Sequence, residues 1–318
     1  MLPSTLMSPA SQFAPAACSL AAVFIWGTSD FTGGYASRRA NAFVFTAFSH
    51  ACALLLMVSL ALAQHAPFPS RTSILWALLA GGIGGFSLAI FYRALAEGKM
   101  GLTAPIAALL SAAIPTLADI AIEGAPHAWT FAGFALAILS IWLITRSEPA
   151  RKAAQDSTPQ SEKENDNQVD DDQADDEEKS GSVPKGVAVA ALAGIGFAVF
   201  YLCIRQAGAG SPLWIAAISR AASFVVTAVA VVATKAPLRL DLPSAAMAAV
   251  AGSFDITGSA LFIYASQHGR LDEAVVISSL YPAVTVILAR LILKEHFSRW
   301  RLIGLLAALA AVPMIASG

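Results

Sequence analysis

The chain has 318 residues, of which 57% are apolar and only 13% charged, and its mean hydropathy is +0.65. Soluble domains average about 45–50% apolar and about 25% charged residues, because even a large core needs a polar shell. The composition therefore excludes an ordinary soluble enzyme and predicts an all-α integral membrane protein. With a formal net charge of −1 and no basic stripe interleaved with aromatic residues, nucleic acid is excluded as a partner.

Apolar runs of membrane-crossing length follow one another along the chain. A helix needs about 20 residues to cross a hydrocarbon core of about 30 Å, whereas barrel strands need only about 10 alternating residues. No Lys or Arg precedes Arg38, so the first run lacks the basic region of a signal peptide and is predicted to be a retained span. The ten expected transmembrane helices cover residues 16–36, 42–63, 73–95, 100–121, 128–145, 187–207, 213–233, 245–266, 272–293 and 300–316.

A polar segment divides the ten spans into two groups of five. Residues 147–185 contain more than half of the 21 acidic residues and almost no apolar ones. Such a segment buries too little surface to offset its chain entropy, which predicts disorder. The expected organisation is a first five-helix unit over residues 1–146, an acidic disordered linker over 147–185 and a second five-helix unit over 186–318.

The two units repeat one another when the chain is shifted by 171 residues. Gly98 then falls on Gly269 and Leu109 on Leu280 (269 − 98 = 280 − 109 = 171). Three further landmarks obey the same shift: Trp129 on Trp300, Gly133 on Gly304, and Phe43 on Trp214. Because five is odd, the second unit would enter the membrane from the opposite side, which predicts two inverted five-helix repeats. Transporters of this kind often bind their substrate between the repeats near the bilayer midplane.

Several short motifs occur in a fixed order within these units. They are Trp26-Gly27, the runs 30–39 (DFTGGYASRR) and 92–115 (YRALAEGKMGLTAPIAALLSAAIP), Trp129 with Gly133, the run 278–285 (SSLYPAVT), and Lys294-Glu295. In this respect the sequence resembles the EamA-type group of the drug/metabolite transporter (DMT) superfamily. One departure is Gly124-Ala125, where the family has Gly-Glu. The resemblance implies import or efflux of amino acids, sugars, nucleotide derivatives or drugs.

Ionisable side chains within the spans are the first candidates for function, because each costs about 2.5–3.5 kcal/mol to insert. Asp255 lies at the centre of its span, with Ser259 one turn along on the same face. It is either a proton-coupling or cation-binding carboxylate, or a paired aspartate that bridges two helices. Arg220 offers a bidentate fork to a substrate carboxylate or phosphate, or else forms an ion pair with Asp255 or Asp30. Asp30 itself is a site residue or a helix cap, and His50 is a switch or a hydrogen-bonded core histidine.

Other residues are candidates for the cavity wall or for a gate. Asp119 and Arg290 are equivalent in the repeat (290 − 119 = 171) and are expected to form a structural bridge or a gate. Prolines within helices imply kinks, tolerated where neighbours or cavity water satisfy the freed carbonyls. The prolines concerned are Pro105, Pro115 and Pro282. The residues expected to line the cavity, or else to belong to the interfacial aromatic belt, are Trp26, Tyr92, Tyr264 and Gln267.

These features favour a secondary active transporter that carries out efflux or exchange of small metabolites such as amino acids or drugs. The alternatives are a non-transporting membrane scaffold or sensor, and a membrane-embedded enzyme. The five scattered histidines form no HExxH motif, the three cysteines no CxxC pair, and no GxxxxGK[ST] loop occurs, so no enzyme activity, metal or cofactor is expected. The expected partners are the lipid bilayer, a small-molecule substrate and coupling protons, in a monomer or homodimer of the plasma (inner) membrane.

The orientation in the membrane has two conflicting indications. Basic residues are far more numerous in the loops on the side of the acidic linker than on the side of the chain ends. The positive-inside rule then places the linker in the cytoplasm and both ends outside. The family resemblance implies the reverse, with both ends in the cytoplasm. A phosphatase or fluorescent-protein fusion to the C-terminus would separate the two.

Overall fold

The computed structural model describes residues 9–96, 100–145, 175–208, 210–293 and 299–316, and every regular element in them is a helix. The first half contains α1 (Pro9–Ala36), α2 (Ala42–Ala63), α3 (Arg71–Ala96), α4 (Met100–Glu123) and α5 (Ala128–Thr145). The second half contains α6 (Asp175–Gln206), α7 (Pro212–Ala233), α8 (Leu242–His268), α9 (Leu271–Ser278), α10 (Tyr281–Leu293) and α11 (Arg299–Ala316).

In the described residues, nine of the ten predicted ranges correspond to one helix each, and the ninth, 272–293, corresponds to two. Within the described residues, five stretches are long and apolar enough to cross a membrane: Ala42–Ala63, Arg71–Ala94, Ala188–Gln206, Pro212–Ala233 and Leu242–His268. Two shorter apolar helices, Leu110–Ile122 and Ala128–Ser140, accompany them. Large apolar side chains remain exposed on the outside of the helices, as at Leu55, Leu62, Val225, Val229 and Val232. Such a surface fits hydrocarbon rather than water.

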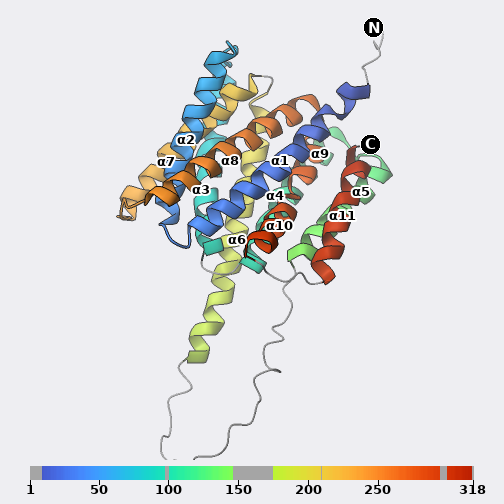
Figure 1. Cartoon of the computed structure of the whole chain (residues 1–318). Helices are drawn as coiled ribbons and strands as arrows, with labels where there is room; N and C mark the ends of the chain where they lie inside the picture. The colour runs from blue at the N-terminus through green and yellow to red at the C-terminus, as the bar shows by residue number, and fades with distance from the viewer. Residues whose placement is uncertain (1–8, 97–99, 146–174, 209, 294–298, 317–318) are drawn as a thin grey trace, which may run out of the picture.

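The start of α6 differs from the prediction. Most of the predicted linker, residues 146–174, lies outside the described residues, but residues 175–185 are helical where disorder was expected. These first turns of α6 extend below the body in Figure 1. The acidic run that begins the helix explains the difference, because negative charge in the first turn interacts favourably with the helix dipole and the free N–H groups there.

The ninth predicted span, 272–293, is two helices rather than one. α9 ends at Ser278 and α10 begins at Tyr281, with a turn at Ser279 and Leu280 between them. Pro282 accounts for the break, because it has no N–H to donate to the carbonyl of Ser278 and it disfavours a helical conformation in the residue before it. The kink predicted at Pro282 is therefore confirmed in a stronger form.

α4 stays one continuous helix through both Pro105 and Pro115, whose predicted kinks do not interrupt it. In the repeat, α4 corresponds to α9 and α10 together. The two halves thus differ at this point: a single helix in the first, a broken helix in the second.

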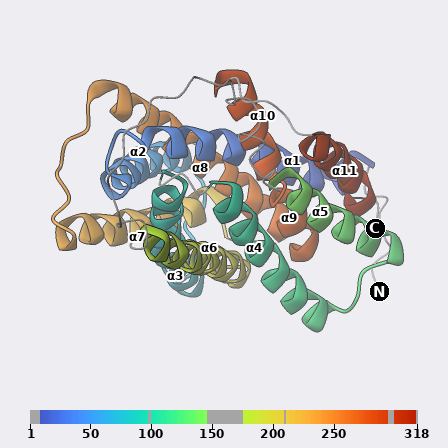
Figure 2. The same cartoon turned by 90° about the horizontal axis from the view of Figure 1, so that it is seen from below.

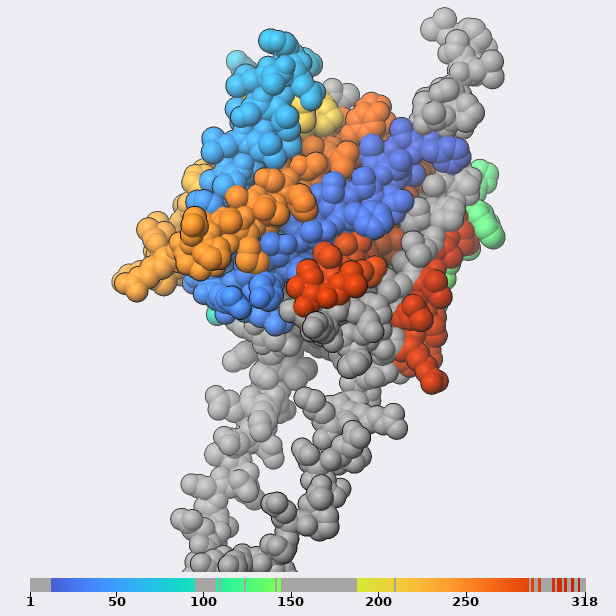
Figure 3. Space-filling model, in the orientation of Figure 1, coloured from blue at the N-terminus to red at the C-terminus, as the bar shows by residue number. Residues whose placement is uncertain are grey.

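The most extensive packing joins helices of different halves. α1 packs along α8 and α3 along α6, α2 packs on α7, and α5 packs on α11. Figures 1 and 2 show α5 beside α11 at one edge of the molecule, and Figure 3 shows α1 and α8 side by side on one face. In the repeat, α1 corresponds to α6 and α8 to α3, so the α1–α8 contact and the α6–α3 contact are equivalent. The α2–α7 and α5–α11 contacts each join a helix to its own counterpart.

The helix bounds refine the shift between the halves. The first residues of α3 and α8 are 171 apart (242 − 71), and so are those of α5 and α11 (299 − 128). The first residues of α2 and α7, and also their last residues, are 170 apart (212 − 42 = 233 − 63). Phe43 therefore corresponds to Leu213, and the predicted equivalence of Phe43 with Trp214 is wrong. The cause is one additional residue in the loop between α7 and α8 relative to the loop between α2 and α3.

Two glycines allow the halves to approach closely at equivalent points. A Cβ placed on Gly81 of α3 would overlap the backbone carbonyl of Ser219 in α7, and one on Gly252 of α8 would overlap that of Ser49 in α2. Gly81 and Gly252 are 171 apart, and Ser49 and Ser219 are 170 apart, so the two contacts are counterparts. Small residues at such crossings permit helix packing in membranes, where no hydrophobic force draws helices together.

Candidate functional site

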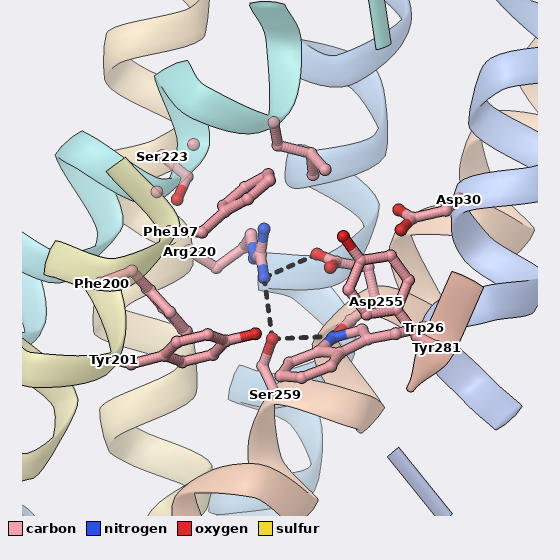
Figure 4. A pocket seen from close by; sticks show the side chains of 13 residues that line it. Trp26, Asp30, Phe197, Phe200, Tyr201, Arg220, Ser223, Asp255, Ser259 and Tyr281 are labelled. Carbon is pink, nitrogen blue, oxygen red and sulfur yellow. Dashed lines mark hydrogen bonds and ion pairs between the residues drawn. The ribbon is translucent and has the colours of Figure 1, made fainter. Parts of the chain in front are cut away.

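A pocket lies in the middle of the bundle, between helices of both halves (Figure 4). The centres of water molecules can occupy about 60 Å³ of it, and part of the pocket is open to the outside. Its walls come from α1, α3, α6, α7, α8 and α10. The polar groups at the wall are Asp30, Arg220, Ser223, Asp255 and Ser259, and the aromatic groups are Trp26, Phe197, Phe200, Tyr201 and Tyr281.

Arg220 and Asp255 form an ion pair on one side of this pocket. Nη2 of Arg220 lies 2.7 Å from Oδ2 of Asp255 and 3.3 Å from the hydroxyl of Ser259, to which it donates a hydrogen bond. The hydroxyl of Ser259 in turn donates to the backbone carbonyl of Asp255 at 2.9 Å, and Trp26 Nε1 donates to the same carbonyl at 3.0 Å. Both charged side chains are buried. The two charges thus offset each other, and hydrogen bonds from α1, α7 and α8 hold the pair in place.

Asp30 has a different environment from Asp255. Its Oδ1 accepts a hydrogen bond from the Tyr92 hydroxyl at 3.3 Å, and that hydroxyl lies 3.4 Å from the hydroxyl of Ser29. Among the described residues, no cationic side chain lies within ion-pair distance of Asp30. Figure 4 shows the carboxylate of Asp30 directed toward the middle of the side chains that line the pocket, opposite the Arg220–Asp255 pair. Asp30 therefore supplies a negative charge that the described wall does not offset.

The pocket brings unlike residues together from equivalent positions of the two halves. Asp255 corresponds to Gly84 and Ser259 to Leu88 (255 − 84 = 259 − 88 = 171), and all four line the pocket. By the shift of 170 that relates the ends of α1 and α6, Asp30 corresponds to Phe200 (200 − 30), also at the wall. The repeat creates the cavity, and the divergence between the halves puts a polar side chain at one position and an apolar residue at its counterpart.

Comparison with models of known protein families gives a match to the EamA-like transporter family over residues 15–146 and 184–317, most of both halves. The chain belongs to the EamA-like transporter family. A solved structure titled "Crystal structure of protein" is 15% identical with a TM-score of 0.66, covering 94% of this chain and 95% of that chain, a likeness of fold alone. A comparison with curated proteins gives no significant match. The protein is thus a multi-pass membrane transporter of the DMT type, in a family of transporters rather than enzymes.

Of the remaining predicted residues of this EamA-like transporter, Tyr92 and His50 lie behind the pocket wall. Tyr92 is buried and reaches the pocket only through its hydrogen bond to Asp30. His50 is fully buried, and its Nδ1 lies 3.4 Å from the hydroxyl of Thr227. It corresponds to Arg220 in the other half (220 − 50 = 170). The contact with Thr227 gives His50 a place in the interface between α2 and α7.

Tyr264 and Gln267 lie away from the pocket, near the end of α8. Tyr264 is exposed and stacks on His268, with 4.1 Å between ring centroids. Nε2 of Gln267 donates to the carbonyls of Gly208 and Gly210 at 2.7 and 3.0 Å. Gln267 therefore ties α8 to the loop between α6 and α7. The prediction that these two residues line the cavity is wrong, because they lie several turns beyond Asp255, closer to the end of the helix.

Asp119 does form a bridge, but with residues other than the predicted one. Its Oδ1 lies 2.6 Å from Nη1 of Arg205, and its Oδ2 accepts a hydrogen bond from the backbone N–H of Asp272 at 2.9 Å. Arg270 donates to both carboxylate oxygens of Asp272, at 3.1 and 2.9 Å, and to the carbonyl of Gly124 at 3.1 Å. We call Asp119, Arg205, Arg270 and Asp272 the end network. Arg290 lies in α10, and its side chain is outside the described residues.

Sequence reasoning missed the members of the site that carry no charge within a span. Tyr201 and Tyr281 line the pocket, and only their place beside the repeated motifs could have singled them out. Asp272 was missed because it lies at the start of a span, where carboxylates are common; in the folded chain it is fully buried. Of the three prolines, Pro282 is next to a pocket residue, Pro115 is buried in α4, and the side chain of Pro105 is outside the described residues.

Proposed function

We propose that this protein is a secondary active transporter of the plasma (inner) membrane that carries out efflux or exchange of small metabolites through the central pocket. The observation that carries the proposal is the buried set of charges, Asp30, Arg220 and Asp255, in a cavity walled by both halves. A scaffold or sensor has no need of buried charges, which are costly at membrane depth.

We further propose that the ten membrane crossings form two inverted repeats, with α9 and α10 together making one broken crossing. The equivalent packings of α1 on α8 and α3 on α6 support this arrangement. So do the chain ends, which emerge at one end of the bundle while α6 enters from the other (Figure 1). In such transporters, one bundle rocks against the other around a fixed site.

We propose protons as the coupling ion, carried by Asp30 rather than by Asp255. Asp255 is held by Arg220 at 2.7 Å, and protonating it would leave a buried guanidinium without its counter-charge. Asp30 has no ionic partner among the described residues, so it can gain and lose a proton without breaking an ion pair. If a proton and a solute bind the carboxylate of Asp30 in turn, the protein exchanges one for the other across the membrane.

Reconstitution into liposomes tests this function. Vesicles loaded with a pH-sensitive dye are challenged with a panel of amino acids, amines, sugars and nucleosides. One solute class is expected to change the internal pH in vesicles that contain the native protein and to leave it unchanged with Asp30→Asn. Asp241→Asn, which removes the same charge at an exposed position before α8, is the matched control. If no solute moves and no pH change occurs, the transport proposal fails.

A further inference from the structure

The charges at the pocket wall do not balance. Arg220 is offset by Asp255, and Asp30 adds a second carboxylate without a cation among the described residues. With all three groups ionised, the described wall carries one excess negative charge. An ionised carboxylate in a low-dielectric site is costly unless it is paired. Since the described residues offer no such partner, a proton or a positively charged ligand would supply the missing charge.

The positive charge of Arg220 is already offset by Asp255, so this arginine is a poor site for an anionic ligand. Its Nη2 is engaged by Asp255 and Ser259, and its Nε is buried with no hydrogen-bond partner among the described residues. Oδ2 of Asp255 is likewise shielded from the open space. A ligand carboxylate or phosphate at the guanidinium would lie close to the negative charge of Asp255, whereas a cation at Asp30 meets a carboxylate without an ionic partner among the described residues.

The remaining wall suits an apolar body attached to that cation. Trp26, Tyr201 and Tyr281 line the pocket with Asp30, and the rings of Trp26 and Tyr201 are 6.2 Å apart between centroids. Figure 4 shows the ring of Tyr281 between the Arg220–Asp255 pair and Asp30, and the indole of Trp26 below them. Aromatic faces attract cations and also pack against apolar groups. A single positive charge next to a ring or short hydrocarbon chain matches both properties of the wall.

We propose that the ligand of this pocket is an amphipathic amine, whose ammonium group binds the carboxylate of Asp30 and whose apolar part packs against Trp26, Tyr201 and Tyr281. This inference rests on the proposed function, since it takes the pocket to be the substrate site. It distinguishes amines from amino acids, because the charge of Arg220, which would have to balance the carboxylate of an amino acid, is already offset by Asp255. Tyr92, which donates to Oδ1 of Asp30 from behind, positions the carboxylate without entering the pocket.

Binding to the purified full-length protein in detergent tests the proposal, with the quenching of tryptophan fluorescence and calorimetry as readouts. The probe is 2-phenylethylammonium, and its analogues of similar size are neutral 2-phenylethanol, anionic 3-phenylpropionate and zwitterionic phenylalanine. Only the amine is expected to bind saturably. Asp30→Asn is expected to weaken it about tenfold or more, a loss typical of one charge-assisted hydrogen bond. Asp241→Asn is expected to bind the amine as the native protein does, and Asp30→Glu, which keeps the charge, to bind it more tightly than Asp30→Asn.

Three results would overturn the proposal: no binding of the amine, equal binding of 2-phenylethanol, or binding of 3-phenylpropionate in its place. The comparison of ligands on the native protein decides the matter even if Asp30→Asn does not fold, as judged by size-exclusion chromatography. Failure of transport can be told apart from failure of this inference. Amine binding without solute movement in vesicles would contradict transport alone, and proton-linked movement of an anion without amine binding would contradict only the ligand class.

Discussion

Asp119 in α4 and Arg205 in α6 form an ion pair between the two halves of the transporter, with 2.6 Å between Oδ1 and Nη1. The same carboxylate accepts the backbone N–H of Asp272 at the start of α9, and Asp272 is held by Arg270. Because successive helices cross the body in alternate directions, this end network lies at the end that carries both chain ends. It joins α4 of the first half to α6 and α9 of the second.

Asp119→Asn is expected to loosen this end of the bundle. The amide keeps an acceptor for the N–H of Asp272 but loses the ionic attraction to Arg205, whose side chain is 25% exposed. A cost of about 1–3 kcal/mol follows, less than for a fully buried pair because solvent screens the arginine. The measurement is thermal unfolding in detergent, where the variant should unfold at a lower temperature than the native protein.

Cys203 is buried two residues before Arg205, so its accessibility reports whether this end of the bundle has loosened. In a Cys18→Ala, Cys52→Ala background, maleimide labelling of Cys203 is expected to be faster with Asp119→Asn than without it. Asp241→Asn serves as the control for loss of one negative charge. Equal labelling rates in the two proteins would mean that the end network does not hold α4, α6 and α9 together.

The Arg220–Asp255 pair should behave as a unit in a double-mutant cycle. Asp255→Leu leaves the buried guanidinium without its counter-charge and is expected to cost about 3–5 kcal/mol, while the combined change Arg220→Met, Asp255→Leu removes both charges and should be less destabilising than either single change. Thermal unfolding of the four proteins measures this. Additive losses would show that the two side chains do not depend on one another.

The glycine contacts between the halves predict a sharp difference between neighbouring positions. Gly81→Ala places a methyl group against the carbonyl of Ser219, so α3 and α7 must separate, and Gly252→Ala does the same to α8 and α2. Gly82→Ala is the matched control, because its new methyl group would meet only Val226 at an ordinary contact distance of 3.7 Å. Lower thermal stability and slower transport are expected for the first two variants and not for the third.

The sequence predicted the helices better than the site. The ends of α2 and α5 agree with the prediction, because loops rich in proline, glycine or charge interrupt apolar runs of clear length. Hydropathy says how deep Asp30, Arg220 and Asp255 lie, and depth alone identified them as candidates. It does not say how far along a helix the pocket extends, so Tyr264 was named as a cavity candidate although it lies beyond the pocket. It also does not say which way a side chain points around its helix, so Tyr281 was not named.

Pair assignments were the least predictable part. Equivalence in the repeat suggested Arg290 as the partner of Asp119, but two equivalent residues of an inverted repeat lie at opposite ends of the bundle unless both are near its middle. Asp119, four residues from the end of α4, is instead close to the end of α6 and the start of α9, where Arg205 and Asp272 lie. The geometry of the repeat, rather than the sequence shift alone, selects the partner.

The orientation in the membrane can be predicted from the number of basic residues at each end of the bundle. Arg205 and Arg270 are two of the few basic residues at the end that carries both chain ends, and both are paired with carboxylates, to Asp119 and Asp272. That end has few basic residues, while Arg38, Arg39, Lys235 and Arg239 all lie at the opposite end. The positive-inside rule then places the linker side in the cytoplasm. A C-terminal alkaline phosphatase fusion is expected to be active and a C-terminal fusion to green fluorescent protein to be dark. A fluorescent, phosphatase-inactive pair of fusions would instead place both ends in the cytoplasm, as the family resemblance implies.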